Sequence, residues 1–489
     1  MAEPLIYDLS KAGRAAVRLP DADVELSSLP DHLVREELPL PELSELDVVR
    51  HFVRLSQLNH AIDTGFYPLG SCTMKYNPKV NEDAARLLGF AFSHPLQDQE
   101  LSQGCLILMY QLQEWLKEIG GFAGVSLQPA AGAHGELTGL LIIQAYHRDR
   151  GDHKRKKILV PDSAHGTNPA STTMAGMEVI ELPSDPRGNI DLEKLRQVCD
   201  ETVAGVMLTN PNTLGLFEEH VLEVSKQVHG CGGLIYGDGA NMNALLGIVR
   251  PGDLGFDVLH YNLHKTFSTP HGGGGPGSGP VGVREQLVEY LPGPVVDIVD
   301  PGDGEIPPLF GLVGPEKSIG RVKSFHGHFG IFVRAYTYMR ILGKTGLRDV
   351  ADYAVLNANY LRAKLRDTYH IPYDRICMHE FVAEGQWPDA PDVHALDISK
   401  RLMDFGFHPP TNYFPLIVHE ALMIEPTETE SVETLDAFVE AMLSIAEEAH
   451  SNPELLKTAP HNTPFGRLDE VKAAKDLVLC CRPIDVPKA

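Results

Sequence analysis

The sequence lacks the features that mark membrane, secreted and zinc-binding proteins. No apolar run approaches the roughly 20 residues that a membrane-spanning helix requires. The first residues, Met1 to Pro4, do not show the basic and then apolar pattern of a secretory signal. Seven cysteines are scattered without CxxC or other metal-binding spacing. We therefore expect no disulfide framework, no metal site and no membrane association, and a reducing, cytoplasmic location.

Basic residues are too few and too dispersed for a nucleic-acid-binding protein. The chain has 42 Lys and Arg residues against 66 Asp and Glu residues, which gives a net charge of −24 at pH 7. A phosphate backbone is bound by clustered basic side chains. The one basic run, residues 154–157, directly precedes an apolar segment that predicts a buried strand. No nucleic-acid partner is expected.

The most informative segment that is present surrounds Lys265. An apolar, strand-like stretch, residues 256–263, leads to His264 and Lys265, and the glycine run 272–275 follows soon after. A lysine that forms an imine with a cofactor aldehyde needs a partly desolvated pocket, because its amine must lose its proton. It also needs closely approaching backbone, which glycine permits. Taken alone, this segment leaves open a surface lysine beside a flexible linker.

Two upstream segments supply further parts of a pyridoxal 5'-phosphate site, which needs a phosphate cradle and a group that stacks on the ring. Gly132 and Ala133 open an apolar helical run, and the unpaired N–H groups of a helix start favour a phosphate. His165 follows the short apolar strand 157–160, at the strand end where ligands bind in open α/β sheets. We expect it to stack on the ring; the alternative is a loop histidine in water.

Two more apolar strands end in polar residues. Residues 203–208 end at Thr209, and residues 234–236 lead to Asp238 between two glycines. A carboxylate there keeps a pyridine nitrogen protonated, although Asp-Gly is also a common turn. Asp238 and Lys265 are one strand–helix–strand step apart. This order predicts a fold-type-I PLP-dependent α/β enzyme, with a large domain containing a mostly parallel sheet flanked by helices and a smaller C-terminal α/β domain.

With these residues in view, the chain resembles the pyridoxal-phosphate half of the glycine cleavage system P-protein, the decarboxylating glycine dehydrogenase. That family occurs as one long polypeptide or as two subunits, and this chain resembles the second, beta, subunit of an α2β2 assembly. The matching segments are residues 65–78, 128–136, 162–171, 209–215 and the His264–Lys265 loop.

The resemblance implies roles for individual residues. The catalytic set is Lys265 as the Schiff-base lysine, His165 as the stacking residue and Asp238 as the partner of the pyridine nitrogen. The cofactor-binding set is Lys265, Gly132, Ala133, His165, Thr209, Asp238, Ala240 and His264, with Thr209 near the phenolic oxygen and Gly132 and Ala133 at the phosphate.

The resemblance also implies a reaction and partners. The reaction is PLP-dependent decarboxylation of glycine, with transfer of the aminomethyl group to the lipoyl group of the H-protein. The partners are the alpha subunit (subunit 1) and the lipoylated H-protein. Two alternatives stay open: another fold-type-I enzyme, such as an aminotransferase or carbon–sulfur lyase, and a non-catalytic scaffold. An aminotransferase would use an arginine such as Arg375 or Arg401 for the substrate carboxylate.

Periodicity predicts three regions. Residues 1–100 form an arm with an amphipathic helix over 42–62 that we expect to wrap a partner subunit. Residues 101–335 form the large cofactor-binding domain, and residues 336–489 form the small domain and a surface tail. One further pair, His326 and His328, suggests a metal, but no third ligand is apparent nearby and PLP chemistry needs none.

Local patterns predict the elements of the small domain. A long helical stretch over 330–369 connects it to the large domain. A further helix is predicted to start at Thr427, because Glu430 completes a capping box three residues later. Strands are predicted at 379–383, 413–418 and 421–425.

Overall fold

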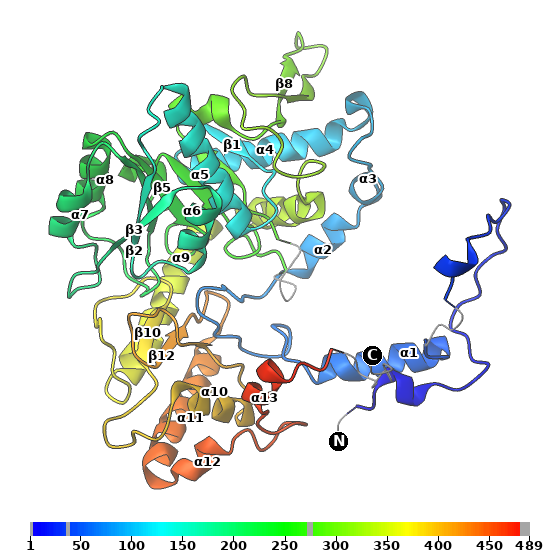
Figure 1. Cartoon of the computed structure of the whole chain (residues 1–489), viewed down its shortest axis with the longest axis vertical. Coiled ribbons are helices and arrows are strands. Elements are labelled where there is room, and N and C mark those ends of the chain that lie inside the picture. Colours follow the sequence, from blue (N-terminus) through cyan, green and yellow to red (C-terminus); the bar gives the residue numbers. More distant parts are fainter. Residues whose placement is uncertain (1–2, 36–39, 271–276, 480–489) are drawn as a thin grey trace.

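The large domain is built on a mostly parallel sheet (Figure 1). The computed structural model describes residues 3–35, 40–270 and 277–479. Within them seven strands form one sheet in the order β1-β7-β6-β5-β4-β2-β3, in which β7 runs antiparallel to the other six strands. The strands are β1 (Gly124–Ser126), β2 (Lys157–Pro161), β3 (Glu178–Leu182), β4 (Val203–Thr209), β5 (Leu234–Gly239), β6 (Val258–Tyr261) and β7 (Val281–Val283).

Helices cover both faces of this sheet, so successive side chains of a strand, which point to opposite sides, enter two different cores. In β6, Val258 packs in the core that contains α5, whereas Leu259 packs in the core that contains α4, α8 and the first part of α9. The helices of this domain are α4 (Gln103–Gly120), α5 (Gly132–Asp149), α6 (Thr167–Met174), α7 (Leu192–Val198) and α8 (Val221–Gly230), and a hairpin of β8 (Val295–Asp300) and β9 (Leu309–Val313) lies at its edge (Figure 1).

The register of the parallel strands brings three polar side chains into line. Thr209, the last residue of β4, pairs with Asp238 of β5, and Asp238 pairs with His260 of β6. All three therefore lie at the carboxyl edge of the sheet, where open α/β sheets bind their ligands.

The helix α9 (Phe329–Leu365) joins the two domains. Gly343 interrupts it with a φ of 59° and a ψ of −169°, a conformation that favours glycine. Residues before the kink pack in the large-domain core and residues after Val355 pack in the small-domain core. The small domain contains the antiparallel strands β10 (Phe381–Glu384), β12 (Ala421–Ile424) and β11 (Thr411–Asn412), and the helices α10 (Ala395–Asp404), α11 (Val432–Ser451) and α12 (Pro453–Lys457).

Two local predictions for the small domain are wrong. Residues 413–418 form no strand, since Tyr413 has a φ of 59° and Pro415 has no N–H to donate to a ladder. The helix predicted to start at Thr427 is α11, which begins at Val432, because Thr427 has a φ of 63°. Its N-cap is Ser431, whose hydroxyl accepts the backbone N–H of Thr434 at 3.3 Å.

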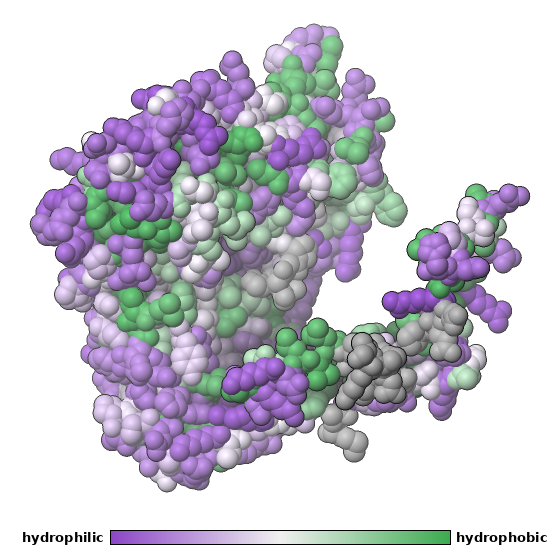
Figure 2. Space-filling view, in the orientation of Figure 1, coloured by the Kyte–Doolittle hydropathy of each residue, from purple (hydrophilic) through white to green (hydrophobic). Residues whose placement is uncertain are grey.

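The first hundred residues divide into an outlying part with one helix and a part that contacts both domains. The amphipathic helix is α1 (Glu45–Gln57), and its apolar side chains Val49 and Phe52 are more than half exposed. Figures 1 and 2 show α1 standing away from the body of the molecule. Further helices are α2 (Lys79–Ala85), α3 (Leu88–Ala91) and, near the other end of the chain, α13 (Glu470–Lys475). Within the described ranges no helix is long and apolar enough to cross a membrane.

Residues 66–77, here called the linking segment, connect this arm to both domains. Phe66 packs in the small-domain core, and Leu69 forms a bridge with Ile424 at the end of β12. Next, α2 packs on α9, where Glu82 accepts two hydrogen bonds from Arg334 at 2.7 and 2.8 Å. The linking segment thus brings residues of the arm to the junction between the domains.

Candidate active site

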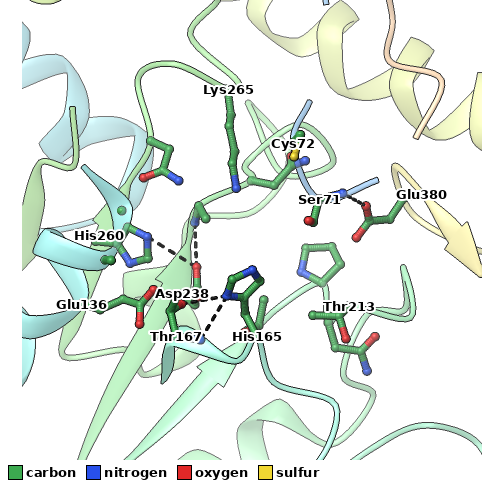
Figure 3. A pocket seen from close by; sticks show the side chains of 18 of the residues that line it. Ser71, Cys72, Glu136, His165, Thr167, Thr213, Asp238, His260, Lys265 and Glu380 are labelled. Atoms are coloured by element: carbon green, nitrogen blue, oxygen red, sulfur yellow. Dashed lines mark hydrogen bonds and ion pairs between the residues drawn. The ribbon is translucent and has the colours of Figure 1, made fainter. Parts of the chain in front are cut away.

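A cavity of about 260 Å³ lies at the carboxyl edge of the sheet, where the two domains and the linking segment meet (Figure 3). Ser71 and Cys72 line it from the linking segment, and His379 and Glu380 line it from the small domain. The structure brings every sequence-predicted site residue to this cavity, namely Gly132, Ala133, His165, Thr209, Asp238, Ala240, His264 and Lys265.

Lys265 lies in a tight loop that begins two residues after β6. Its backbone N–H donates to the carbonyl of Asn262 at 3.2 Å, and its own carbonyl accepts the N–H of Ser268 at 3.0 Å. These bonds fix the backbone, so that the side chain extends into the cavity towards the carboxylate of Asp238 (Figure 3). The neighbouring residue His264 accepts the backbone N–H of Ser278 on its Nδ1 at 3.3 Å. The glycine run at 272–275 lies outside the described residues.

Asp238 is a buried carboxylate held in its ionised form. The Asn168 amide donates to Oδ2 at 3.1 Å, the backbone N–H of Ala240 donates to Oδ1 at 3.0 Å, and Nε2 of His260 lies 3.5 Å from Oδ1. Burial alone raises the pKa of this group. His260, the surrounding donors and Lys265 together outweigh burial, so the pKa of Asp238 lies below its usual value. The turn-former alternative therefore does not describe this side chain, which points into the cavity.

His165 lies at the entrance to α6 and is exposed to the cavity. Its Nδ1 accepts the backbone N–H of Thr167 at 3.2 Å and lies 2.8 Å from the hydroxyl of the same residue. That hydroxyl donates to Glu136 at 2.6 Å, and Phe414 packs edge-on against the imidazole at 5.4 Å. The ring is thus held from two sides in a position that can cover one face of a planar cofactor.

The beginning of α5 provides an anion-binding surface. The N–H groups of Gly132 and Ala133 belong to the first turn of the helix, where the helix dipole favours negative charge. A Cβ atom at position 132 would lie within 3 Å of the side-chain amide of Asn262, so a larger residue there would displace that amide. The hydroxyl of Thr209 and Oδ1 of Asn262 are buried and have no hydrogen-bond partner among the described residues. These donors and orphaned atoms fit a phosphorylated pyridine aldehyde.

Several functional side chains were missed by the sequence reasoning. Glu136, one turn into α5, accepts hydrogen bonds from Thr167, Asn168 and Ser171. Because Asn168 also donates to Asp238, this network positions a carboxylate that lines the cavity. Glu136 lies in a quoted motif four residues after Gly132, so helical periodicity was the signal that could have identified it.

A second acidic group in the cavity was also missed. Glu380 and Glu425 lie at adjoining ends of β10 and β12, and His379 is beside them. All three side chains are buried, with exposed fractions of 2% for His379, 3% for Glu380 and 0% for Glu425. Each residue lies at the edge of a predicted strand, but nothing in the sequence indicates that the two strand ends meet beside Lys265.

The arginines considered for an aminotransferase lie elsewhere. Arg375 donates to the carbonyls of Arg187 and Phe217, and Arg401 is paired with Glu448 and Asp404. Among the described residues that line the cavity there is no arginine. The histidine pair is also separate from this cavity: His328 hydrogen-bonds the carbonyl of Gly277 at 2.7 Å, and neither His326 nor His328 belongs to a three-residue group with metal-ligand spacing among the described residues.

Comparison with known proteins agrees with this geometry. The family profile described as glycine cleavage system P-protein matches residues 25–386, and one described as glycine dehydrogenase, C-terminal domain, matches residues 350–462. The chain is 59% identical to the probable glycine dehydrogenase (decarboxylating) subunit 2 of Caldanaerobacter subterraneus subsp. tengcongensis, over 97% of this chain and 98% of that one. It is 57% identical to the protein of the same description from Alkaliphilus oremlandii, over 97% of each chain.

Solved structures show the same fold. The crystal structure of glycine decarboxylase (P-protein) of the glycine cleavage system, in inhibitor-bound form, has a TM-score of 0.73 and 24% identity, over 85% of this chain and 93% of that one. A NifS-like protein has a TM-score of 0.59 and 17% identity, over 78% and 99%. The fold-type-I prediction is confirmed, and pyridoxal 5'-phosphate is the cofactor that this fold and this site accommodate. By its sequence over nearly its whole length, the chain belongs to the glycine cleavage system P-protein family.

Proposed function

We propose that this chain carries the catalytic site of a glycine-decarboxylating enzyme of the glycine cleavage system. Pyridoxal 5'-phosphate, when bound, supplies an aldehyde for an imine and a ring that accepts electrons from the substrate. The protein then removes CO2 from glycine and passes the remaining aminomethyl group to the lipoyl group of the H-protein. The observation that carries this proposal is the meeting of Lys265 with the ionised Asp238 in one buried cavity.

Each predicted residue has a defined task in this proposal. Lys265 holds the cofactor aldehyde, and the negative charge of Asp238 keeps the pyridine nitrogen protonated. His165 covers the ring, while Thr209 takes the phenolic oxygen. The first turn of α5, with Gly132 and Ala133, binds the phosphate, and Ala240 supports this arrangement through its N–H bond to Asp238.

The lining of the cavity supports loss of CO2 over transamination. An aminotransferase site usually holds the substrate α-carboxylate with an arginine, and the described lining residues include none. Water and ion pairs stabilise a carboxylate and thereby oppose its departure as neutral CO2, so a buried site without arginine favours decarboxylation. The alternative of a scaffold without catalysis is disfavoured for another reason, since a scaffold has no need of a lysine facing an ionised, buried aspartate.

The partners form a second part of the proposal. Relatives described as subunit 2 have a counterpart subunit, and we assign the exposed apolar face of α1 to contact with subunit 1 in an α2β2 assembly. Val49 and Phe52 on this face are 52% and 55% exposed, which is costly in an isolated chain. A cytoplasmic location belongs to the same proposal, and the free thiols of Cys72, Cys105 and Cys377 support it.

Isotope exchange tests this function. The full chain, co-purified with its partner subunit and loaded with cofactor, should exchange label between bicarbonate and the carboxyl group of glycine, but not of alanine. Borohydride treatment should leave the cofactor attached to Lys265 in the peptide that mass spectrometry identifies. Conversion of the cofactor to its amine form by glycine, without exchange, would instead establish an aminotransferase and contradict the proposal.

A further inference from the structure

The carboxyl groups of Glu380 and Glu425 form a pair beside the reaction centre. Glu380 precedes β10 and Glu425 follows β12, next to the register pair of Phe381 and Ile424. One oxygen of each carboxyl group and one ring nitrogen of His379 all lie within 4.8 Å of one another. Glu380 also lines the cavity that Lys265 enters, and Figure 3 shows its carboxyl group beside Ser71. The site residues that the resemblance implies for this chain include neither glutamate.

Hydrogen bonds divide the pair into an ionised and a protonated member. Glu425 accepts the backbone N–H of Thr73 at 2.9 Å and the amide of Asn241 at 2.7 Å. Glu380 accepts only one N–H among the described residues, that of Ser71 on Oε2 at 2.8 Å. Since N–H donors stabilise a carboxylate, the negative charge resides on Glu425 and a proton on Glu380.

The neighbouring charges support one shared proton. Burial lowers the pKa of His379 to about 3, so this imidazole is neutral and cannot balance two carboxylates. Its Nε2 lies 3.6 Å from Oε1 of Glu380, beyond hydrogen-bond distance, and its buried Nδ1 has no partner among the described residues. Burial raises the pKa of Glu380 well above its usual range, and the adjacent Glu425 raises it further. Burial likewise raises the pKa of Glu425 to about 7, although Thr73, Asn241 and Lys265 act against it.

We propose that Glu380, with Glu425 as its partner, is the acid that protonates the departing sulfur atom when the aminomethyl group is transferred. This inference rests on the proposed function. In that step the glycine carbon bonds to one sulfur of the lipoyl disulfide and the S–S bond breaks. The electron pair of that bond goes to the second sulfur, which takes the proton from Glu380. The carbon is oxidised, the disulfide is reduced, and the pair regains one proton from solvent in each turnover.

Two other groups of the cavity lie near the same reaction centre. Asp238 is held ionised and has no proton to give. Lys265, which glycine displaces from the cofactor aldehyde, is the competing proton donor, and the Glu380→Gln variant distinguishes it from Glu380. The raised pKa of Glu380 brings its acidity close to that of a thiol, so a proton on Glu380 can pass to the departing sulfur at neutral pH.

The test separates the two halves of the reaction in the assembled, cofactor-loaded enzyme. Exchange of label between bicarbonate and glycine requires no sulfur acid, whereas aminomethyl transfer to free lipoamide disulfide does. Glu380→Gln should lower transfer by about 100-fold or more and exchange by less than about tenfold. Glu430→Gln is the matched control, because burial also raises the pKa of Glu430 to about 7 but this residue does not line the cavity. It should leave both rates unchanged.

A second readout does not depend on activity. Infrared difference spectra between wild type and Glu380→Gln at pH 8 should contain the C=O stretch of a protonated carboxyl group, whereas those of Glu430→Gln should not. Glu425→Gln removes the repelling neighbour, so the protonated band of Glu380 and the alkaline limb of the transfer rate should both move to lower pH. Glu380→Asp is expected to restore neither the carboxyl band nor the transfer rate of the wild type, because its carboxyl group is one methylene shorter.

Defined outcomes overturn the inference. Equal loss of exchange and transfer in Glu380→Gln would assign the residue to positioning alone, and unchanged transfer would exclude it as the acid. Should this variant fail to assemble, wild-type spectra from pH 6 to 9 decide, because without a protonated carboxyl band at pH 8 the pair has no proton to donate. Failure of the wild type to exchange label would instead refute the proposed function.

Discussion

Two corners of the cavity contain buried carboxyl groups near Lys265, and these differ in charge: Asp238 is ionised and Glu380 is protonated. Asp238 and Glu380 are 6% and 3% exposed, so burial opposes ionisation in both. The pKa of Asp238 is nevertheless lowered, by His260, the Asn168 amide, Lys265 and the Ala240 N–H. The pKa of Glu380 is raised, because burial and Glu425 outweigh one N–H donor and Lys265.

The difference shows that local donors and charges, and not depth, decide which carboxyl group keeps its proton. The Asp238 corner belongs to the strands of the large domain, whose register places Thr209, Asp238 and His260 in one row. The Glu380 corner is assembled from the linking segment and the small domain. In our proposals one corner provides fixed negative charge for the cofactor, and the other provides a proton for the acceptor. The following predictions test this contrast, beginning with the largest effect.

Removal of the Lys265 amine should have the largest effect. Lys265→Ala should abolish the absorbance of the cofactor imine and reduce glycine–bicarbonate exchange to background, because no other lysine lines the cavity among the described residues. Visible absorbance and isotope exchange are the measurements. Lys226→Ala, an exposed change on α8, is the control and should behave as wild type. An imine band that persists in Lys265→Ala would contradict the assignment.

Neutralising the ionised corner should come next. Asp238→Asn keeps the shape of the side chain but removes the charge opposite the pyridine nitrogen. We expect exchange to fall by about 10²- to 10³-fold, in the range seen when one preorganised electrostatic partner is lost. Thermal unfolding should show that the variant is folded. Exchange at the wild-type rate in a folded Asp238→Asn would show that the ring nitrogen needs no anionic partner here.

The corner that contains Glu380 and Glu425 should make the free energy of unfolding depend on pH. A carboxyl group whose pKa rises from 4.5 to about 7 on folding, as in Glu425, stabilises the fold at low pH, and this contribution is lost as the pH rises through that window. Glu425→Gln removes the dependence. The unfolding free energy of the variant relative to wild type should therefore increase by on the order of 2 kcal/mol between pH 5 and pH 8. Urea unfolding at the two pH values measures it, and a parallel response of both proteins would count against a raised pKa.

Loss of one amide donor in each corner should have smaller effects, on exchange in one corner and on transfer in the other. Asn168→Ala removes a donor to Asp238 and raises its pKa, so exchange should decline severalfold at low pH. Asn241→Ala removes a donor to Glu425 and raises its pKa, so the alkaline limb of the transfer rate should move to higher pH. The pH profiles of both variants measure these shifts. Identical displacement of the two profiles would mean that the corners are not distinct.

Sequence patterns were sufficient for the large domain because its contacts follow a regular order. The apolar strands before His165, Thr209 and Asp238 all appear as predicted, as β2, β4 and β5. In a parallel sheet every strand delivers its following residues to the same edge, so their convergence on Lys265 follows from connectivity alone. Predictions failed where the backbone turns, at Tyr413 and Thr427, since positive φ values of non-glycine residues are not evident from residue type.

By itself, the sequence determined the fold class, the cofactor and the positions of Thr209 and Asp238 at the ends of apolar strands, since strand periodicity and chain order are local properties. Only the tertiary structure decided that Ser71 meets Glu380 and Glu425, which lie more than three hundred residues further along the chain, beside Lys265. The charge state of that corner was likewise undetermined, because the pKa of a carboxyl group depends on burial and on donors from other segments. Those neighbours exist only once the two domains and the linking segment have packed together.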